Sequence, residues 1–174
     1  MSSRSSCYHN IEKVIKILNA KELQDILIED GYNNTQIVVL DDMTFKEQWN
    51  VIRCTHVLVG VQGAGLQWSI FLRSNSGLLE LAHENWNFLF SKMHKGFHGL
   101  RVAQLKAKNT KIDWDFIAKV CNHGNPLNET DRQDVLARKP RFGYAWGGAG
   151  FKWADSEYDA EAFLSKIRGL WHNL

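Results

Sequence analysis

The sequence predicts an α/β fold of Rossmann type, in which helices flank a parallel β-sheet. Three observations predict it. Short apolar runs rich in β-branched residues, as expected of strands buried on both faces, alternate with amphipathic helical segments. The connections between these elements are short, which suits right-handed crossovers between parallel strands. A turn rich in glycine joins one of the runs directly to the helix that follows it.

Length and composition limit the classes of protein that the chain can represent. Its 174 residues suit one ordinary domain or one lobe of a larger enzyme. A hydrophobic fraction of 44% and a charged fraction of 23% are typical of a folded globular protein. The net charge of +2 is too close to neutral for a dedicated nucleic-acid-binding protein. No apolar run is long enough to cross a membrane, and the first residues lack the apolar core of a signal peptide.

The three cysteines, Cys7, Cys54 and Cys121, are an odd number and show no metal-ligand spacing. We therefore expect no metal site and no disulfide framework. Free thiols are the default, and a single bridge such as Cys7 to Cys121 stays open if the chain is luminal.

Helix and strand signals alternate through the first half of the chain. Ile11, Val14, Ile15 and Leu18 share one helical face. Asn19 and Glu22 form a capping-box pattern that predicts a helix over 20–30, which ends at a C-cap glycine, Gly31. Further predicted elements are a buried strand at 36–40, a helix opened by a second capping box at Thr44 and Glu47, a strand at 56–61, a helix at 66–72 and a strand at 78–81.

The pattern is weaker beyond Trp86. Residues 85–95 fit either a helix or an irregular loop, while 99–105 indicate a strand and 113–120 a helix. The segment 122–150, rich in Gly, Asn and Asp, predicts a surface excursion. Asp155 or Ser156 is expected to cap a last helix, with a core-facing stripe of Phe163, Leu164, Ile167, Leu170 and Trp171.

The strand, glycine turn and helix at 56–72 form the most informative segment. Backbone N–H groups at the start of such a helix favour an anion, and ligands of open α/β sheets bind outside the carboxyl ends of the strands. A phosphate or diphosphate at Gly63–Leu66 is therefore a natural hypothesis, and the alternative is that the glycines only permit close packing. The turn is neither a complete G-x-G-x-x-G nor a Walker A loop. Glu80 lies near the distance at which a dinucleotide site needs an acidic residue, so a dinucleotide binder is weakened as an alternative but stays open.

Several motifs in a fixed order resemble glycosyltransferase family 61. That family carries S/T-F-x-E-Q, a hydrophobic strand, H-G-A-G-L, F-L-P and a strand that ends in E-L. The corresponding stretches here are 43–48, 56–66, Phe71-Leu72 and 78–81. Arg4-Ser-Ser and the stretch 17–23 resemble the animal branch of the family, which includes an O-GlcNAc transferase. The resemblance covers roughly residues 4–82.

The resemblance implies the C-terminal lobe of a two-lobe, GT-B-type, inverting enzyme that uses UDP-sugars. All of 1–174 would then be one nucleotide-sugar-binding lobe, and the N-terminal lobe would be absent. The turn formed by Gly63, Ala64, Gly65 and Leu66 would lie under the UDP diphosphate, and Arg4 would supply a cation to the same phosphates. Gln62 would donate a hydrogen bond there, and Glu80 would lie near the ribose or sugar hydroxyls.

The same resemblance implies the cofactors, partners and location. It implies a UDP-sugar donor, with UDP-GlcNAc first because of the animal-like stretch, no permanently bound cofactor and no metal. The acceptor would be a protein or a glycan, without nucleic acid or a membrane segment, in the lumen of the endoplasmic reticulum or Golgi.

Two substitutions and the length depart from the family pattern. Gln62 replaces the histidine of H-G-A-G-L and cannot carry a charge at neutral pH, and Arg73 replaces the proline of F-L-P. The catalytic base is expected in the absent lobe, and no histidine here can be assigned that role; His83 and His94 lie near the expected site or on the surface. Two alternatives follow, namely a truncated non-catalytic remnant that acts as a binding module and an unrelated Rossmann-type nucleotide binder.

Overall fold

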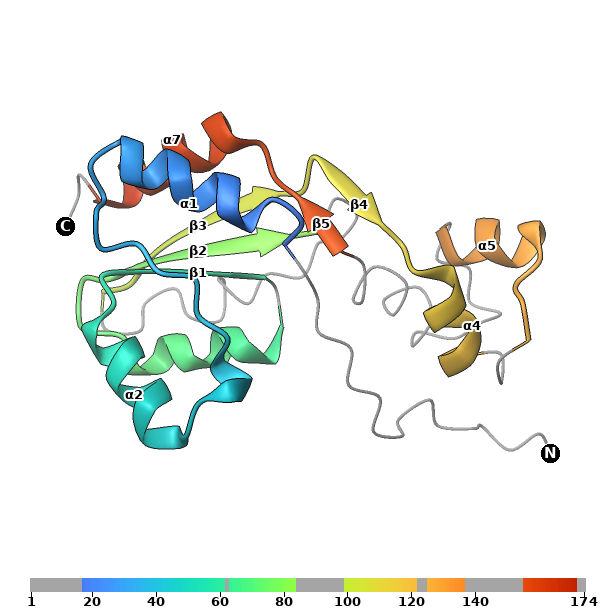
Figure 1. Ribbon diagram of the computed structural model, residues 1–174, viewed down its shortest axis with the longest axis horizontal. Coiled ribbons are helices and arrows are strands. Elements are labelled where there is room, and N and C mark those ends of the chain that lie inside the picture. The colour runs from blue at the N-terminus through green and yellow to red at the C-terminus, as the bar shows by residue number, and fades with distance from the viewer. Residues whose placement is uncertain (1–16, 62, 84–98, 122–124, 137–154, 172–174) are drawn as a thin grey trace. The chain divides into compact units, whose positions relative to one another are not determined.

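The computed structural model of the chain describes residues 17–61, 63–83, 99–121, 125–136 and 155–171 (Figure 1). Contacts divide the chain into two compact units, which we describe separately. The sheet unit comprises residues 17–109 and 156–174, and the second unit comprises residues 1–16 and 110–155. The expectation that 1–174 form one lobe stays a prediction.

A parallel three-stranded sheet lies at the centre of the sheet unit. Its strands are β1 (Val57–Val61), β2 (Gly77–Ala82) and β3 (Arg101–Lys106), in the order β1-β2-β3. Every residue of β2 is buried, as expected for the central strand. The predicted α/β fold class is confirmed, and the strands predicted at 56–61, 78–81 and 99–105 are confirmed to within two residues at each end.

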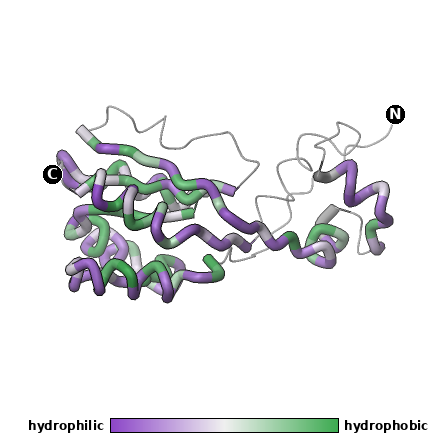
Figure 2. Tube along the Cα trace, turned by 90° about the horizontal axis from the view of Figure 1, so that it is seen from above, coloured by the Kyte–Doolittle hydropathy of each residue, from purple (hydrophilic) through white to green (hydrophobic). Residues whose placement is uncertain are grey.

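Helices cover both faces of this sheet (Figure 1). On one face lie α1 (Ala20–Glu29) and α7 (Ala160–Trp171), and on the other lie α2 (Phe45–Cys54) and η2 (Ala64–Phe71), a 3₁₀ helix. Hydrophobic and hydrophilic residues alternate along the helices in Figure 2, as amphipathic helices require. Alternation along the strands gives each face its own core. The first core contains Leu23, Leu27, Leu79, Leu81, Leu105, Phe163, Ile167 and Leu170, and the second contains Ile52, Leu72 and Leu100.

The predicted N-terminal cap is present at α2 but not at α1. The capping box of α2 is confirmed, because Thr44 Oγ1 accepts a bond from the Glu47 amide and the Glu47 side chain accepts one from the Thr44 amide at 2.8 Å. Gly31 has a φ of 94°, as expected of a C-cap glycine after α1. Asn19 makes no side-chain bond to the backbone of α1, so the first predicted capping box is wrong. Asn19 instead bonds the Glu22 side chain and the backbone of Tyr158.

Two predicted elements of the sheet unit take other forms. Residues 36–40 form no strand: Ile37 is 54% exposed and Val39 52% exposed, and a short 3₁₀ helix, η1 (Leu40–Asp42), follows. β-branched residues favour an extended chain but cannot supply a neighbouring strand, and β2 is the one strand that pairs with β1 in the described residues. The helix predicted at 66–72 is η2, whose turns close by bonds such as Leu66 N to Gly63 O, three residues apart.

The second unit contains α4 (Trp114–Cys121) and α5 (Glu129–Leu136). The former agrees with the helix predicted at 113–120. The latter is a helix that was not predicted within 122–150, and its cap is Asn128, whose Oδ1 accepts a bond from the Asp131 amide at 2.8 Å. Ile117, Ala118 and Leu127 form the small core of this unit.

Two short strands, β4 (Asn109–Lys111) and β5 (Asp155–Glu157), pair as a separate sheet. Asp155 and Ser156 therefore lie in a strand and do not cap the last helix; the cap of α7 is Asp159, whose Oδ1 accepts a bond from the Ala162 amide at 2.8 Å. The expectations for 11–16 and 85–95 lie outside the described residues. Among the described helices, none has the length and apolar character needed to span a membrane.

Candidate functional site

The candidate site lies along the carboxyl edge of the parallel sheet. Because the strands are parallel, their carboxyl ends at Val61, Ala82 and Lys106 meet at the same edge. This edge is where open α/β sheets bind their ligands. The turn at Gly63–Leu66 follows β1, and His83 follows β2.

The two glycines of the turn are not required by the packing of the described residues. Gly63 has a φ of 167°, an extended conformation that any residue adopts. A Cβ built on Gly63 would have only Val61 O within 4 Å, at 3.9 Å, and a Cβ on Gly65 would have nothing within 4 Å. The alternative that these glycines serve close packing therefore receives no support from this part of the chain. Bare backbone at this edge leaves room for a ligand to approach the amides closely.

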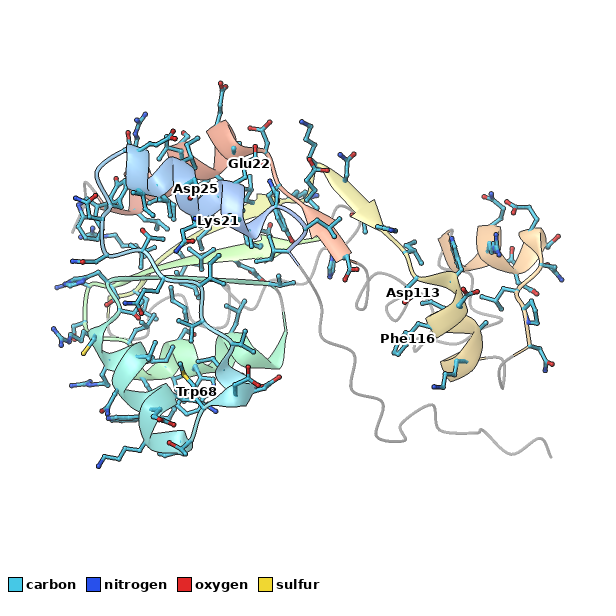
Figure 3. All side chains as sticks on the ribbon, in the orientation of Figure 1. Lys21, Glu22, Asp25, Trp68, Asp113 and Phe116 are labelled. Carbon is cyan, nitrogen blue, oxygen red and sulfur yellow. The ribbon has the colours of Figure 1, made fainter. Side chains whose placement is uncertain are left out.

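Leu66 fixes the start of η2 to the sheet. Its side chain is 2% exposed and lies against Gly60 of β1. Trp68 and Phe71 anchor the rest of η2 in the layer that also contains α2, with Trp68 5.4 Å from the ring of Phe45 (Figure 3). The first amides of a helix have no partner within it and form its positive end. The Leu66 amide itself donates to Gly63 O at 3.1 Å, so the backbone open to a ligand is that of the residues before it, while the Leu66 side chain serves the core.

Glu80 lies inside the sheet, two residues before the end of β2. Its side chain is fully buried, and its register neighbours are Gly60 in β1 and Gln104 in β3. Gln104 Nε2 is also buried and has no hydrogen-bond partner among the described residues. The predicted contact of Glu80 with ribose or sugar hydroxyls stays a prediction, and it would need access to a carboxylate that is now covered.

A buried polar cluster formed by His83, Ser156 and Tyr158 lies where β2 ends. His83 is 1% exposed, so it is not a surface residue, and its Nδ1 lies 2.8 Å from Ser156 Oγ. Burial lowers the pKa of His83, which keeps its ring neutral near pH 7. Burial also raises the pKa of Tyr158 to about 12, against a smaller opposing effect of the Ser156 hydroxyl.

The structure brings together only part of the predicted site. Gly63, Ala64, Gly65 and Leu66 form one turn, and Glu80 lies in the neighbouring strand. Arg4 and Gln62 lie outside the described residues, so their roles stay predictions.

Sequence analysis missed two cations at this edge, Lys106 and Lys108. Both are exposed, at and just beyond the end of β3. The strand predicted at 99–105 could have indicated them, because charged residues that follow a buried strand lie at its carboxyl edge.

The described residues contain no group of three or more His, Cys, Asp or Glu side chains arranged to hold a metal ion. Cys54, at the end of α2, is an exposed free thiol.

Part of the chain is similar to a known protein family. Residues 3–79 match the family described as Glycosyltransferase 61, a segment that includes the glycine turn and ends one residue before Glu80. No curated protein matches the chain. The match supports a glycosyltransferase function in general, and glycosyltransferases act on a donor and an acceptor.

Proposed function

Because residues 3–79 of this chain are related to glycosyltransferase family 61, we propose that the sheet unit is the donor-binding part of an inverting glycosyltransferase that uses a UDP-sugar. The diphosphate would bind in the turn Gly63–Leu66, at the amides that precede Leu66, because the Leu66 amide donates to Gly63 O. UDP-GlcNAc is the first donor to test, and the acceptor would be a protein or a glycan in the secretory pathway.

One observation carries this proposal beyond the family match. Gly63 and Gly65 stand at the carboxyl edge of the sheet, and neither a left-handed φ nor a close neighbour among the described residues requires glycine there. A ligand that approaches the backbone is a physical reason for glycine at such positions, since any side chain would stand between the ligand and the amides.

In the proposed reaction, an acceptor hydroxyl attacks the anomeric carbon from the face opposite UDP. The new bond joins the hydroxyl oxygen to that carbon, the bond from the carbon to the phosphate oxygen breaks, and the hydroxyl proton passes to a base. The turn would stabilise the negative charge that develops on the departing UDP. Gln62 can add a hydrogen bond but no positive charge, so charge stabilisation would depend on the helix start and on cations such as Arg4 or Lys106.

The test is a titration of the purified chain with UDP and UDP-GlcNAc, followed by calorimetry or NMR. We expect saturable binding that Gly65→Val weakens about tenfold or more, because its side chain would cover the amides. Gly169→Val is the matched control, since Gly169 lies in α7 and a Cβ there also meets nothing within 4 Å. Equal affinity of both variants and the wild-type chain would place UDP elsewhere, and absence of binding at millimolar UDP would refute the proposal.

Two further arms of the titration separate the alternatives. Preference for ADP or NAD over UDP would favour an unrelated nucleotide binder. Binding of UDP without transfer of labelled sugar to any acceptor would favour a binding module over an enzyme.

A further inference from the structure

The second unit contains a pocket of about 500 Å³ beside the start of α4. This volume is within the range of small-molecule sites. All the residues that line it fall within 111–155, whereas the family match ends at residue 79. The charged and aromatic residues that line it are Lys111, Asp113, Trp114, Asp115, Arg132 and Asp155.

A cation–π pair of side chains is among the residues that line this pocket. The guanidinium carbon of Arg132, from α5, lies 5.5 Å from the centre of the Trp114 ring, from α4. A cation–π contact of this kind restrains the guanidinium, whose planar N–H groups donate in set directions. Arg132 Nε is buried and has no hydrogen-bond partner among the described residues. A ligand oxygen in the pocket would give this donor the partner that buried polar groups normally have.

An acidic residue on the same wall is held in place by the backbone. Asp113 precedes α4, and its Oδ1 accepts a hydrogen bond from the amide of Phe116 at 2.9 Å (Figure 3). Asp115 and Asp155 add two more carboxylates to the lining. The pocket thus offers hydrogen-bond acceptors as well as the donors of Lys111 and Arg132.

The balance of these groups argues against ions as the ligand. Among the described residues that line the pocket, two are cations and three are carboxylates, so a phosphate would meet carboxylates as well as cations. A cation would compete with Arg132, which already lies over the Trp114 ring. The described carboxylates are not arranged as a metal site. A neutral ligand that both donates and accepts hydrogen bonds fits this lining best.

We propose that this pocket binds a neutral sugar residue of a glycan, with Arg132 and Lys111 donating to its oxygens and Asp113 and Asp115 accepting from its hydroxyls. Neighbouring hydroxyls of a sugar each donate and accept hydrogen bonds, which suits a pocket lined by both donor and acceptor side chains. The inference goes beyond the donor site, because the pocket belongs to the other unit and would bind glycan whether or not the sheet unit binds UDP.

The experiment is an NMR titration of the whole chain with the methyl glycosides of GlcNAc, glucose and xylose, each to tens of millimolar. The Trp114 indole N–H signal is assigned by its loss in Trp114→Phe. We expect at least one glycoside to shift this signal, and the Arg132 Nε–H signal, along a saturable curve. Parallel titrations with inorganic phosphate, calcium chloride and UDP complete the set.

Variants test the contacts directly. Arg132→Lys keeps the charge but removes the guanidinium plane, and we expect about a tenfold loss of affinity, equivalent to one hydrogen bond of about 1.4 kcal/mol. Asp115→Asn, at an exposed position, keeps the shape and serves if the first variant does not fold. Lys111→Gln should also weaken binding, whereas Lys119→Gln, at an exposed residue of α4 that does not line the pocket, should not.

The inference would be overturned if the shifts caused by the glycosides did not saturate, or if only phosphate or calcium shifted the Trp114 signal along a saturable curve. Equal effects of the two lysine variants would overturn it as well. The outcome with UDP affects only the donor site, because the turn and the pocket are followed by different signals.

Discussion

A Cβ built on Gly60 would lie 2.7 Å from Cδ2 of Leu66, so β1 and η2 meet at a position where only glycine fits without movement. Leu66 is 2% exposed and cannot turn outward without opening the core. The path of the turn between the two elements therefore depends on a glycine that lies in the strand, before the turn itself.

Gly60→Ala should lower the free energy of unfolding by about 1 to 3 kcal/mol, the usual cost of overpacking. Urea unfolding followed by circular dichroism measures it. In a chain that already carries Leu66→Ala, adding Gly60→Ala should lower the free energy of unfolding by less than it does in the wild-type chain. Gly65→Ala is the control, because a Cβ at Gly65 meets nothing within 4 Å. Equal costs for Gly60→Ala and Gly65→Ala would contradict the packing argument.

Acid should destabilise the chain through His83. Burial lowers the pKa of its ring from an ordinary value of 6.5, so the unfolded chain takes up the proton more readily than the folded chain. The contribution of His83 to the free energy of unfolding is complete above the unfolded-state pKa of 6.5 and is lost as the pH falls toward the lower pKa of the folded state. The loss amounts to at most about 1.4 kcal/mol for each unit by which folding lowers the pKa.

Unfolding curves at about pH 7 and about pH 5 measure this effect. In His83→Gln the difference between the two should shrink, because the buried ring is removed. A pH dependence that His83→Gln leaves unchanged would assign the effect to other groups.

Thr44→Ala should lower the free energy of unfolding by about 1 kcal/mol, because it removes the N-cap oxygen of α2. Thermal unfolding compares it with Thr44→Ser, which retains the hydroxyl and should stay close to the wild-type chain. If the serine variant were as unstable as the alanine variant, the methyl group and not the cap would be responsible.

Asn19→Ala should lower the free energy of unfolding by more than the partial exposure of the Asn19 side chain suggests. The Asn19 side chain donates to Tyr158 O at 2.7 Å and accepts from Tyr158 N at 3.1 Å. Loss of these bonds should lower the free energy of unfolding by about 1 to 3 kcal/mol and speed hydrogen exchange at the Tyr158 amide. Asn109→Ala, which removes one exposed bond to Glu157, should have little effect on either measurement.

Gln62→His restores the histidine of the resembled motif and should tighten UDP binding several-fold at about pH 6, where an imidazole near its ordinary pKa carries positive charge. The gain should fade toward about pH 8. Gln67→His makes the same change at an exposed residue of η2 and should bring no gain. Equal gains in the two variants would indicate a general charge effect.

The sequence predicts best where local chemistry decides the structure. The Thr44 and Glu47 box, Gly31 and the strands around Leu58, Leu79 and Val102 are each explained by neighbours in the chain or by apolar runs. It fails where a distant partner decides. Ile37 and Val39 have the composition of a buried strand but are exposed, and Asn19 bonds a residue 139 positions away in place of capping its own helix.

The candidate site divides in the same way. The glycine turn could be identified from its position after a strand, and its role as a binding site stays a prediction. The burial of Glu80 and His83 could not be predicted, because it depends on which layers cover them. The pocket beside Arg132 was missed because a helix, α5, was not expected there; the N-cap pattern of Asn128 and Asp131 was the available signal.

The packing of α7 against the sheet has a consequence for protein synthesis. Phe163, Ile167 and Leu170 of α7 pack in the same core as Leu23 and Leu27 of α1. The apolar face of α1 is therefore fully covered only after α7 has been synthesised. A nascent chain on the ribosome would hold β2 and α1 with one apolar face open until residue 170 has left the exit tunnel. Translation of the sheet unit therefore contains a long interval in which chaperones, and not the finished core, must protect these surfaces.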